Sequence, residues 1–522
     1  MSRLRVLLVM LSFTLLTIII TSGLNAYAAT YYVQQSGGDD SNDGTSPATP
    51  WRNCPGMETY AGAGTLSPGD TVYFDSGDTW LVTGTQGLYL VGGVTYIGDY
   101  WGSGMRAEIK ANANLEAGVI RFRDHATDAT VFKGFNVNCN NKVTSGIDIN
   151  HRYWQLMNGA LKRVENCEVH HVSSRQSSGQ YKYGIIISNH GGVGGYAENV
   201  QIIDCIIHDI SRDGICLYPG DANADCRIKN ITVRGCEVYN TGQDPDYGAG
   251  AGLLVKGYVQ GAYLEYNYVH STKGAGIFVN GNENNHHGVG PTSIHIRYNI
   301  VSTPTIHGCI RIYDKGADPK DIKIYGNIVM NNTMTGGLSL EGNSGTLKLL
   351  VYNNTFYESF VRFTNHSSTI NTLEFKNNII YCTTAVPLMA NSGNIKQHSN
   401  NIYYRGGGSI VIIGNQNYTA SNVGSWESTA VSSNPMFKDS SMLPSGFDVA
   451  YDTDLRPNTD GLAIIGEGSP AKDSGAVLES PYDGSINSVL RVTVDGWDRG
   501  AYELNVSERP EPPSNLRVVE SR

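Results

Sequence analysis

A short pattern of apolar and polar positions recurs along the middle of the chain. The stretches "VENCEVHHV" at 164–172, "IIDCIIHDI" at 202–210 and "VRGCEVYNT" at 233–241 each place an apolar residue three positions before a cysteine and another two positions after it. This spacing is typical of a strand whose alternate side chains point inward. Aligned on the cysteine, the same slot falls on Cys167, Cys205, Cys236, Asn267, Asn299, Asn327, Asn354, Asn378 and Asn401, in steps of 23 to 38 residues.

A second strand follows the slot in most repeats, and a glycine usually opens it. The examples are "GIIIS" at 184, "GICLY" at 214, "GLLVK" at 252, "GIFVN" at 276 and "GLSLE" at 337. Short strands that recur at this period, with variable turns between them, are typical of a parallel β-helix, in which each coil buries its apolar face against its neighbours. The pattern predicts an all-β solenoid of about ten coils over residues 85–405.

The slot has a structural explanation. A buried turn leaves backbone groups unpaired, and an Asn side chain stacked between two others can satisfy them. Cysteine is small and tolerates burial, so it can stand in the same place. We therefore expect Cys167, Cys205 and Cys236 to stack as buried thiols. The nine cysteines form no CxxC pair and no Cys/His metal pattern.

Composition and charge narrow the function classes. The net charge is −10, the pI is near 5.7, and only 16% of the residues are charged. A nucleic-acid partner is not expected, because binding phosphates requires a basic face and the chain has no cluster of Lys and Arg.

The first 28 residues have the layout of a secretory signal peptide. Arg3 and Arg5 precede an apolar run from Val6 to Ile20, and Ala26 and Ala28 follow at A-x-A spacing. The run has fifteen residues, fewer than the roughly 20 needed to span a bilayer. The sequence thus predicts cleavage after Ala28, no membrane span in the mature chain, and a secreted or cell-surface location.

Flanking motifs resemble those of pectate-lyase-like, right-handed parallel β-helix repeat proteins of bacteria. "DDSNDGTSPATPW" at 39–51 and "LSPGDTVYF" at 66–74 are similar to their entry segment, and "SNPMF" at 433–437, "GSPAKDSG" at 468–475 and "DGWDRGAYEL" at 495–504 to their closing segment. The resemblance implies an entry segment at 29–84, the β-helix at 85–405, a closing segment at 406–505 and a linker-like tail at 506–522. It implies export more strongly than activity, because the family includes lyases, hydrolases, epimerases and proteins without known chemistry.

Strand alternation points to one candidate binding face. Residues between the inward apolar pairs of the second strand should face outward from adjacent coils, about 4.8 Å apart. They include Tyr218, Lys256, Phe278, Asn280, Arg311 and Tyr313. Aromatic platforms beside two cations suit an anionic polysaccharide, although scattered cations are also usual on an ordinary solvated sheet.

A second candidate is a metal site on neighbouring turns. Asp209, Asp213, Asp244 and Asp246 should lie near one another, and clustered carboxylates with backbone oxygens can hold Ca²⁺. Aspartates in turns also commonly cap their own backbone.

Three functions are compatible with these residues. The first is a lyase acting on uronic-acid chains, with Lys256 as base and Arg311 stabilising the enolate; the resemblance implies Lys or Arg in such roles. The second is a glycoside hydrolase, which requires two facing carboxylates, with Glu341, Asp314 and Asp213 as loose candidates. The third is a non-catalytic glycan-binding or adhesin-type surface protein. A monomer is expected in each case.

Overall fold

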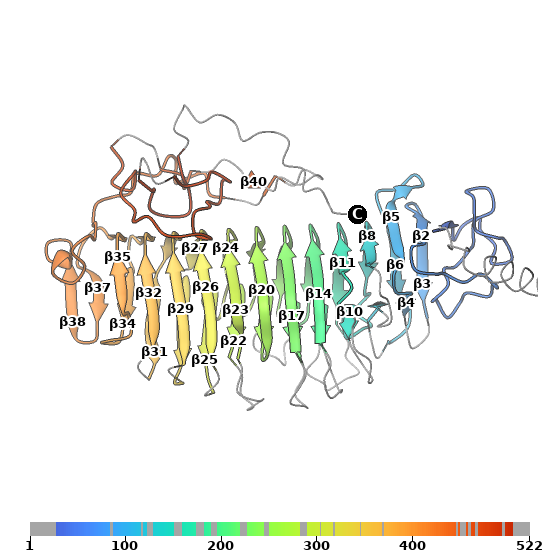
Figure 1. Ribbon diagram of the computed structural model, residues 1–522, viewed down its shortest axis with the longest axis horizontal. Helices are drawn as coiled ribbons and strands as arrows, with labels where there is room; N and C mark the ends of the chain where they lie inside the picture. Colours follow the sequence, from blue (N-terminus) through green and yellow to red (C-terminus); the bar gives the residue numbers. More distant parts are fainter. Residues whose placement is uncertain are drawn as a thin grey trace, which may run out of the picture.

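Three long parallel sheets wind along one axis in the computed structural model (Figure 1). The structure describes residues 28–83, 87–115, 118–122, 129–150, 159–173, 182–188, 196–219, 227–244, 250–281, 290–302, 304–316, 319–332, 334–344, 346–367, 370–444, 447–448, 456–457, 461–464, 468–492 and 496–504. The predicted signal peptide and tail lie outside these residues. No helix in the described ranges is long and apolar enough to cross a membrane.

Each coil contributes one strand to each sheet, named here A, B and C. The order along sheet A is β1 (Thr30–Val33), β2 (Thr71–Asp75), β5 (Thr95–Trp101), β8 (Thr130–Lys133), β11 (Lys162–Glu165), β14 (Tyr196–Ile203), β17 (Arg227–Arg234), β20 (Val259–Glu265), β23 (Thr292–Arg297), β26 (Lys320–Tyr325), β29 (Leu347–Tyr352), β32 (Thr372–Lys376) and β35 (Gln397–Ser399).

Sheet C follows sheet A in each coil. It holds β3 (Thr79–Val82), β6 (Ala107–Ala111), β9 (Phe135–Asn138), β12 (Glu168–Val172), β15 (Ile206–Ile210), β18 (Glu237–Thr241), β21 (Tyr268–His270), β24 (Ile300–Ser302), β27 (Ile328–Asn332), β30 (Thr355–Ser359), β33 (Ile379–Tyr381) and β36 (Ile402–Tyr404).

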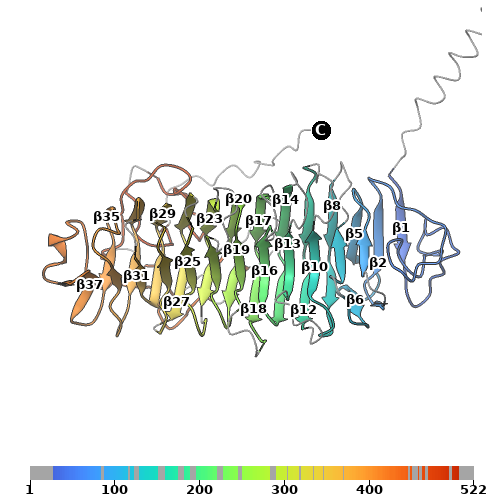
Figure 2. The ribbon, with the colours of Figure 1, turned by 90° about the horizontal axis from the view of Figure 1, so that it is seen from below.

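Sheet B completes the coil (Figure 2). It holds β4 (Leu88–Leu90), β7 (Ile120–Phe122), β10 (Ser145–Asn150), β13 (Tyr183–Ser188), β16 (Asp213–Tyr218), β19 (Leu253–Lys256), β22 (Ile277–Asn280), β25 (Ile310–Asp314), β28 (Leu338–Gly342), β31 (Val361–His366), β34 (Leu388–Ala390), β37 (Ser409–Ile413) and β38 (Gln416–Thr419). The β37–β38 pair is antiparallel. A short 3-10 helix (Val423–Ser425) and the small β39 (Phe447–Asp448) and β40 (Arg456–Pro457) pair follow.

These sheets confirm the predicted fold class. They extend past the expected 85–405, since β1, β2 and β3 precede that range and β37 follows it. Inward Val, Ile, Leu and Phe side chains from all three sheets form one continuous buried core.

The turn from sheet A to sheet C has two residues in every coil from β11 to β36. The first residue has a positive φ, between 50° and 66°, which Asn, Asp and Gly adopt more readily than other residues. The second residue is the Cys or Asn slot. From β11 onward, the first positions are Asn166, Asp204, Gly235, Tyr266, Tyr298, Gly326, Asn353, Asn377 and Asn400.

The asparagines of the slot form a continuous buried ladder, as predicted. Asn299 is 0% exposed; its Nδ2 donates to the Leu264 carbonyl at 2.8 Å and to Asn327 Oδ1 at 2.9 Å. The same pattern links each slot asparagine to the next, from Asn267 to Asn401. At the end, Asn401 Nδ2 donates to both carboxylate oxygens of Glu427, which is itself 2% exposed.

The cysteines of the slot are also buried, and the prediction of stacked thiols is confirmed. Cys167, Cys205 and Cys236 are unpaired thiols with at most 1% exposure. Burial raises the pKa of the Cys167 and Cys205 thiols well above its ordinary value, so both stay protonated.

The glycine that opens several strands of sheet B faces the core. A Cβ built on Gly184, Gly214, Gly252 or Gly276 would lie 2.3–2.5 Å from a side-chain carbon of Ile207, Val238, Val269 or Val301 respectively. Any side chain here would overlap the inner face of sheet C. The residue before the glycine points outward instead, which places Tyr183 and Asp213 on the outer face of sheet B.

We expect Gly214→Ala to lower the free energy of unfolding by about 1–3 kcal/mol, the usual effect of overpacking a filled core. Its Cβ would lie 2.4 Å from Val238 Cγ1 and 2.6 Å from the Gly252 carbonyl oxygen. Urea unfolding measures the change. Gly407→Ala is the control, because a Cβ there meets no atom within 4 Å. Equal midpoints for the two variants would contradict the steric explanation.

The segment after the solenoid folds back along the A–C turns (Figure 1). Asn377 Nδ2 donates to the Ala476 carbonyl at 2.8 Å, and Asn377 Oδ1 accepts from Ala476 N at 2.7 Å. Asn353 and Asn400 donate to the carbonyls of Tyr482 and Ser474 in the same way. Packing around Trp497 and Tyr482 completes the contact.

Candidate functional site

Long connections border sheet B on both sides. Seven to eleven residues join β13 to β14, β16 to β17 and β22 to β23, and ten or eleven join β12 to β13 and β18 to β19. The A–C turn, by contrast, has two residues in each coil from β11 to β36. Insertions in a stacked solenoid collect on one side, which is often the binding side.

The outer face of sheet B carries the predicted residues in register. Lys256 pairs with Asn280, and Asn280 with Tyr313; in the neighbouring row Phe278 pairs with Arg311. Tyr218 lies on the strand preceding Lys256, in the same row. The structure thus brings all six predicted residues, Tyr218, Lys256, Phe278, Asn280, Arg311 and Tyr313, onto one face, which we call the sheet-B face.

Part of this face is more buried than strand alternation predicted. Tyr218 is 4% exposed and Asn280 is 9% exposed. Tyr218 belongs to a small apolar cluster on the outside of the sheet, together with Tyr183, Ile186, Cys216, Ala251 and Leu254. The expectation that every outward residue faces solvent was wrong here, because adjacent coils place large apolar side chains side by side.

Lys256 lies at the border of this cluster. Its Nζ is 4.6 Å from the centroid of the Tyr218 ring, a cation–π contact, and the side chain is half-buried. Asp213 lies close enough for Lys256 to act on its charge.

Asp213 is a buried carboxylate and was expected to be a metal ligand. It is 3% exposed; its Oδ1 accepts from Ala251 N at 2.7 Å, and its Oδ2 lies 3.2 Å from Arg212 Nε. Burial raises the pKa of Asp213, against the influence of Arg212, the Ala251 N–H and Lys256.

The other predicted metal ligands have protein partners as well. Asp209 accepts from Asn240 and is paired with His208, and Asp244 Oδ2 lies 2.6 Å from Lys182 Nζ. Asp246 lies outside the described residues. In the part of the chain that the structure describes, no group of three His, Cys, Asp or Glu side chains is arranged to hold a metal ion.

Arg311 is held by Glu341, which lies on the adjacent strand β28 opposite Tyr313. Arg311 Nη2 donates to Glu341 Oε2 at 2.6 Å and its Nε to Oε1 at 3.2 Å, a bidentate pair. The guanidinium carbon lies 4.9 Å from the Phe278 ring centroid and 5.7 Å from that of Tyr313. The sequence predicted the two rings but not the ion pair.

The carboxylates required for hydrolysis are not free. Asp314 is 0% exposed and paired with Lys320 and His366 inside the fold. Glu341 is paired with Arg311, and Asp213 is buried. No two of these present facing carboxylates on the sheet-B face.

Sheet C carries a stack of rings that the sequence analysis missed. His170, His208, Tyr239 and His270 lie on adjacent strands with centroids 4.9–5.2 Å apart and nearly parallel planes. Burial and the neighbouring His171 and His208 lower the pKa of His170 to about 4. Burial also acts to lower the pKa of His208, but hydrogen bonds to Glu168 and Asp209 outweigh it and raise that pKa. The sequence contains a signal for this stack: the residues that alternate with the inward apolar positions just after the Cys or Asn slot are His170, His208, Tyr239 and His270.

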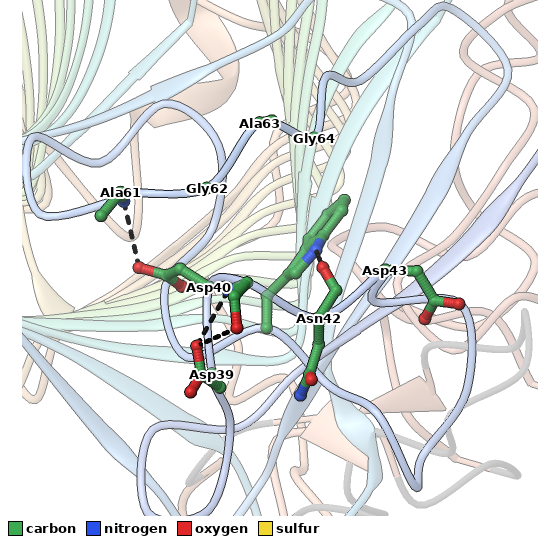
Figure 3. A pocket seen from close by; sticks show the side chains of 10 residues that line it. Asp39, Asp40, Asn42, Asp43, Ala61, Gly62, Ala63 and Gly64 are labelled. Carbon is green, nitrogen blue, oxygen red and sulfur yellow. Dashed lines mark hydrogen bonds between the residues drawn. The ribbon is translucent and has the colours of Figure 1, made fainter.

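A pocket of about 520 Å³ lies in the entry segment, lined by residues 39–43, Trp51 and residues 61–64 (Figure 3). Its carboxylates serve the local backbone: Asp40 accepts from Asn53 N and Ala61 N, and Asp39 accepts from Ser41. Trp51 is 1% exposed and donates to the Asn42 carbonyl. The polar groups that line the pocket therefore hold together the entry segment next to β1.

Comparisons with known proteins agree with this fold. Residues 145–356 match a family model described as right handed beta helix region. A search of curated proteins gave no match. Similar solved structures include pectate lyase Pel9A, with 16% identity, 93% of this chain and 98% of that chain covered, and a TM-score of 0.46.

Two further solved structures are similar to this chain. XylC in complex with xylose has 9% identity over 91% of this chain and 98% of that chain, with a TM-score of 0.48. The A-module of mannuronan C-5 epimerase AlgE4 from Azotobacter vinelandii has 14% identity over 70% and 91%, with a TM-score of 0.37. The three parallel sheets give this chain the fold of a right-handed parallel β-helix, and residues 145–356 match the family model for that region.

Proposed function

We propose that the protein is an exported, polysaccharide-active enzyme that binds an acidic sugar chain along the sheet-B face and cleaves it by β-elimination. Lys256 is the base and Arg311 neutralises the sugar carboxylate. Export by the predicted signal segment would bring this face to polysaccharides outside the cytoplasm.

One observation carries the proposal. Lys256 and Arg311 lie on the same outer face, on β19 and β25, with only β22 between them. Two strand spacings amount to about 9.6 Å, and Arg311 lies one row away, about 6.6 Å along the strand. The two Cα atoms are therefore about 12 Å apart, and both long side chains can reach one sugar unit between them. Phe278 and Tyr313 flank Arg311, and Asn280 supplies an amide between the cations.

The chemistry follows from the substrate. In a uronic-acid chain, the carbon next to the carboxylate loses its proton to the Lys256 amine, which must first give up its own proton to solvent. Positive charge at Arg311 stabilises the resulting enolate, and the electron pair then expels the glycosidic oxygen of the neighbouring sugar. The expelled oxygen takes up a proton from water to become the hydroxyl of one new chain end, the other product carries the unsaturated sugar, and Lys256 returns its proton to solvent.

Lys256→Ala should lower turnover of a uronic-acid polymer by at least about 100-fold, the usual contribution of a general base. Its stability should fall by no more than about 1 kcal/mol, since the lost contact is one cation–π pair. Ultraviolet absorbance of the unsaturated product, with and without added Ca²⁺, measures the rate. Lys348→Ala is the control, because Lys348 lies on sheet A with a 52% exposed side chain.

Two results would count against this function. Unchanged turnover in Lys256→Ala would exclude Lys256 as the base. Retention of the wild-type protein on a column of acidic glycan, without any product in solution, would support the non-catalytic binder instead.

A further inference from the structure

A row of polar side chains continues along the sheet-B face beyond Arg311. Arg311 on β25 pairs with Ser339 on β28, and Ser339 pairs with Arg362 on β31. Their neighbours Ile310, Leu338 and Val361 are fully buried in the core, so the three polar side chains point outward. Two arginines therefore flank one hydroxyl, with their Cα atoms about 10 Å apart across two strand spacings.

Two polar atoms in this row lack partners. Ser339 is 2% exposed, and neither its Oγ nor Arg362 Nε has a hydrogen-bond partner within the described part of the chain. A buried hydroxyl without a partner destabilises a folded protein, so it is rarely found without another role. Both atoms can serve an oxygen of an added ligand: the guanidinium as donor, the hydroxyl as donor or acceptor.

The charges nearby leave a positive excess. Glu341 is paired with Arg311, while no acidic side chain among the described residues forms an ion pair with Arg362. The nearby His307 adds no charge near neutral pH, because burial and the charge of Arg311 lower its pKa. The row thus carries two cations against one carboxylate.

We propose that Arg311, Ser339 and Arg362 form a subsite for a carboxylate of the sugar chain, and that Glu341 occupies the Arg311 end of it in the free protein. This rests on the proposed function, because it assumes an acidic polysaccharide on the same face. The Glu341 carboxylate holds Arg311 as an incoming uronate would, with two parallel hydrogen bonds. Binding exchanges one carboxylate for another, and the displaced Glu341 side chain, 21% exposed, turns to solvent.

The proposed role of Glu341 predicts that its removal strengthens binding of the sugar chain. Removing a partner from an ion pair normally weakens a site, but here Glu341 competes with the ligand. Glu341→Gln should therefore bind a short uronic-acid oligosaccharide about three- to tenfold more tightly than the wild type, because Arg311 no longer exchanges one charged hydrogen-bond partner for another. The methyl ester of the same oligosaccharide, which has no charge, should gain nothing.

The two other residues should act in the opposite direction. Arg362→Gln should weaken binding of the oligosaccharide about tenfold and reduce its salt dependence. Ser339→Ala should weaken binding about threefold while the thermal midpoint stays equal or rises, since it deletes a hydroxyl with no partner in the free protein. A purely structural serine would show the reverse.

Titration calorimetry at two salt concentrations tests the set, with Arg163→Gln on sheet A as the matched control. The subsite is overturned if Glu341→Gln binds no better than the wild type, or if Arg362→Gln behaves like Arg163→Gln. A wild type that binds neither the acid nor its ester would instead remove the proposed function, and the subsite with it.

Discussion

Replacing Asn327 by leucine should lower the free energy of unfolding by about 3–5 kcal/mol. The Asn327 amide donates to the Ile296 carbonyl at 2.8 Å and to Asn354 Oδ1 at 2.9 Å, and it accepts from Asn299 N at 3.0 Å. Leucine has a similar volume, but it leaves these groups unpaired at a position where Asn327 is 0% exposed. Each unsatisfied buried group costs about 1–3 kcal/mol. Urea unfolding followed by circular dichroism measures the loss.

Two further variants distinguish the loss of the ladder hydrogen bonds from the general effect of replacing an asparagine. Asn417→Leu, at an exposed position on β38, should change stability by less than about 0.5 kcal/mol. Asn327→Cys should lose less than Asn327→Leu, because Cys167, Cys205 and Cys236 occupy the same slot and their thiols contact backbone carbonyls. A ladder that tolerates leucine as well as cysteine would contradict the hydrogen-bond explanation.

Asp314→Asn should also lower stability by about 3–5 kcal/mol at neutral pH, the usual cost of breaking a buried ion pair from one side. The Asp314 carboxylate is 2.9 Å from both Lys320 Nζ and His366 Nε2, and the side chains of all three residues are at most 1% exposed. The substitution leaves the Lys320 ammonium buried without a counter-charge.

The effect should depend on pH in a definite direction. Burial acts to raise the pKa of Asp314, but hydrogen bonds from His366, Ser344 and Lys320 outweigh it and hold the pKa below its ordinary value. The carboxylate therefore stabilises the fold above the ordinary pKa near 4, and this contribution is lost as the pH falls from there through the lowered pKa. Wild type and Asp314→Asn should converge in acid, whereas Glu479→Gln, at an exposed position, should follow the wild type throughout.

The fold could be predicted because its pattern is local and repeated. The slot from Cys167 to Asn401 and its flanking apolar residues determine which side chains enter the core, and these positions were predicted from spacing alone. The positive-φ residue before the slot was visible only as a mixture of Asn, Asp, Gly and Tyr, so the two-residue turn required the backbone. The return of the closing segment onto Asn353, Asn377 and Asn400 depends on contacts about 75–130 residues apart, which no local pattern encodes.

The candidate site was predicted in part, because the positions of its residues also follow from the repeat. Alternation placed Lys256, Asn280 and Arg311 on one face, because neighbouring coils stay in register. It could not show that Glu341 holds Arg311, that Asp213 is buried, or that Tyr218 lies in an outer apolar cluster. These three features depend on the lengths of the side chains and on their contacts between coils, which the spacing of the sequence repeat does not determine.

The asparagine ladder also gives the solenoid a sense of direction. Every slot amide donates toward the next coil, so a chain of aligned dipoles runs from Asn267 to Asn401 and ends on a negative charge, Glu427. Glu427 also accepts from Tyr403 and from Asn401 N, which uses both of its oxygens. A carboxylate can only accept, so no further amide could continue the series past it. Glu427 is thus the acceptor-only end of this hydrogen-bonded series.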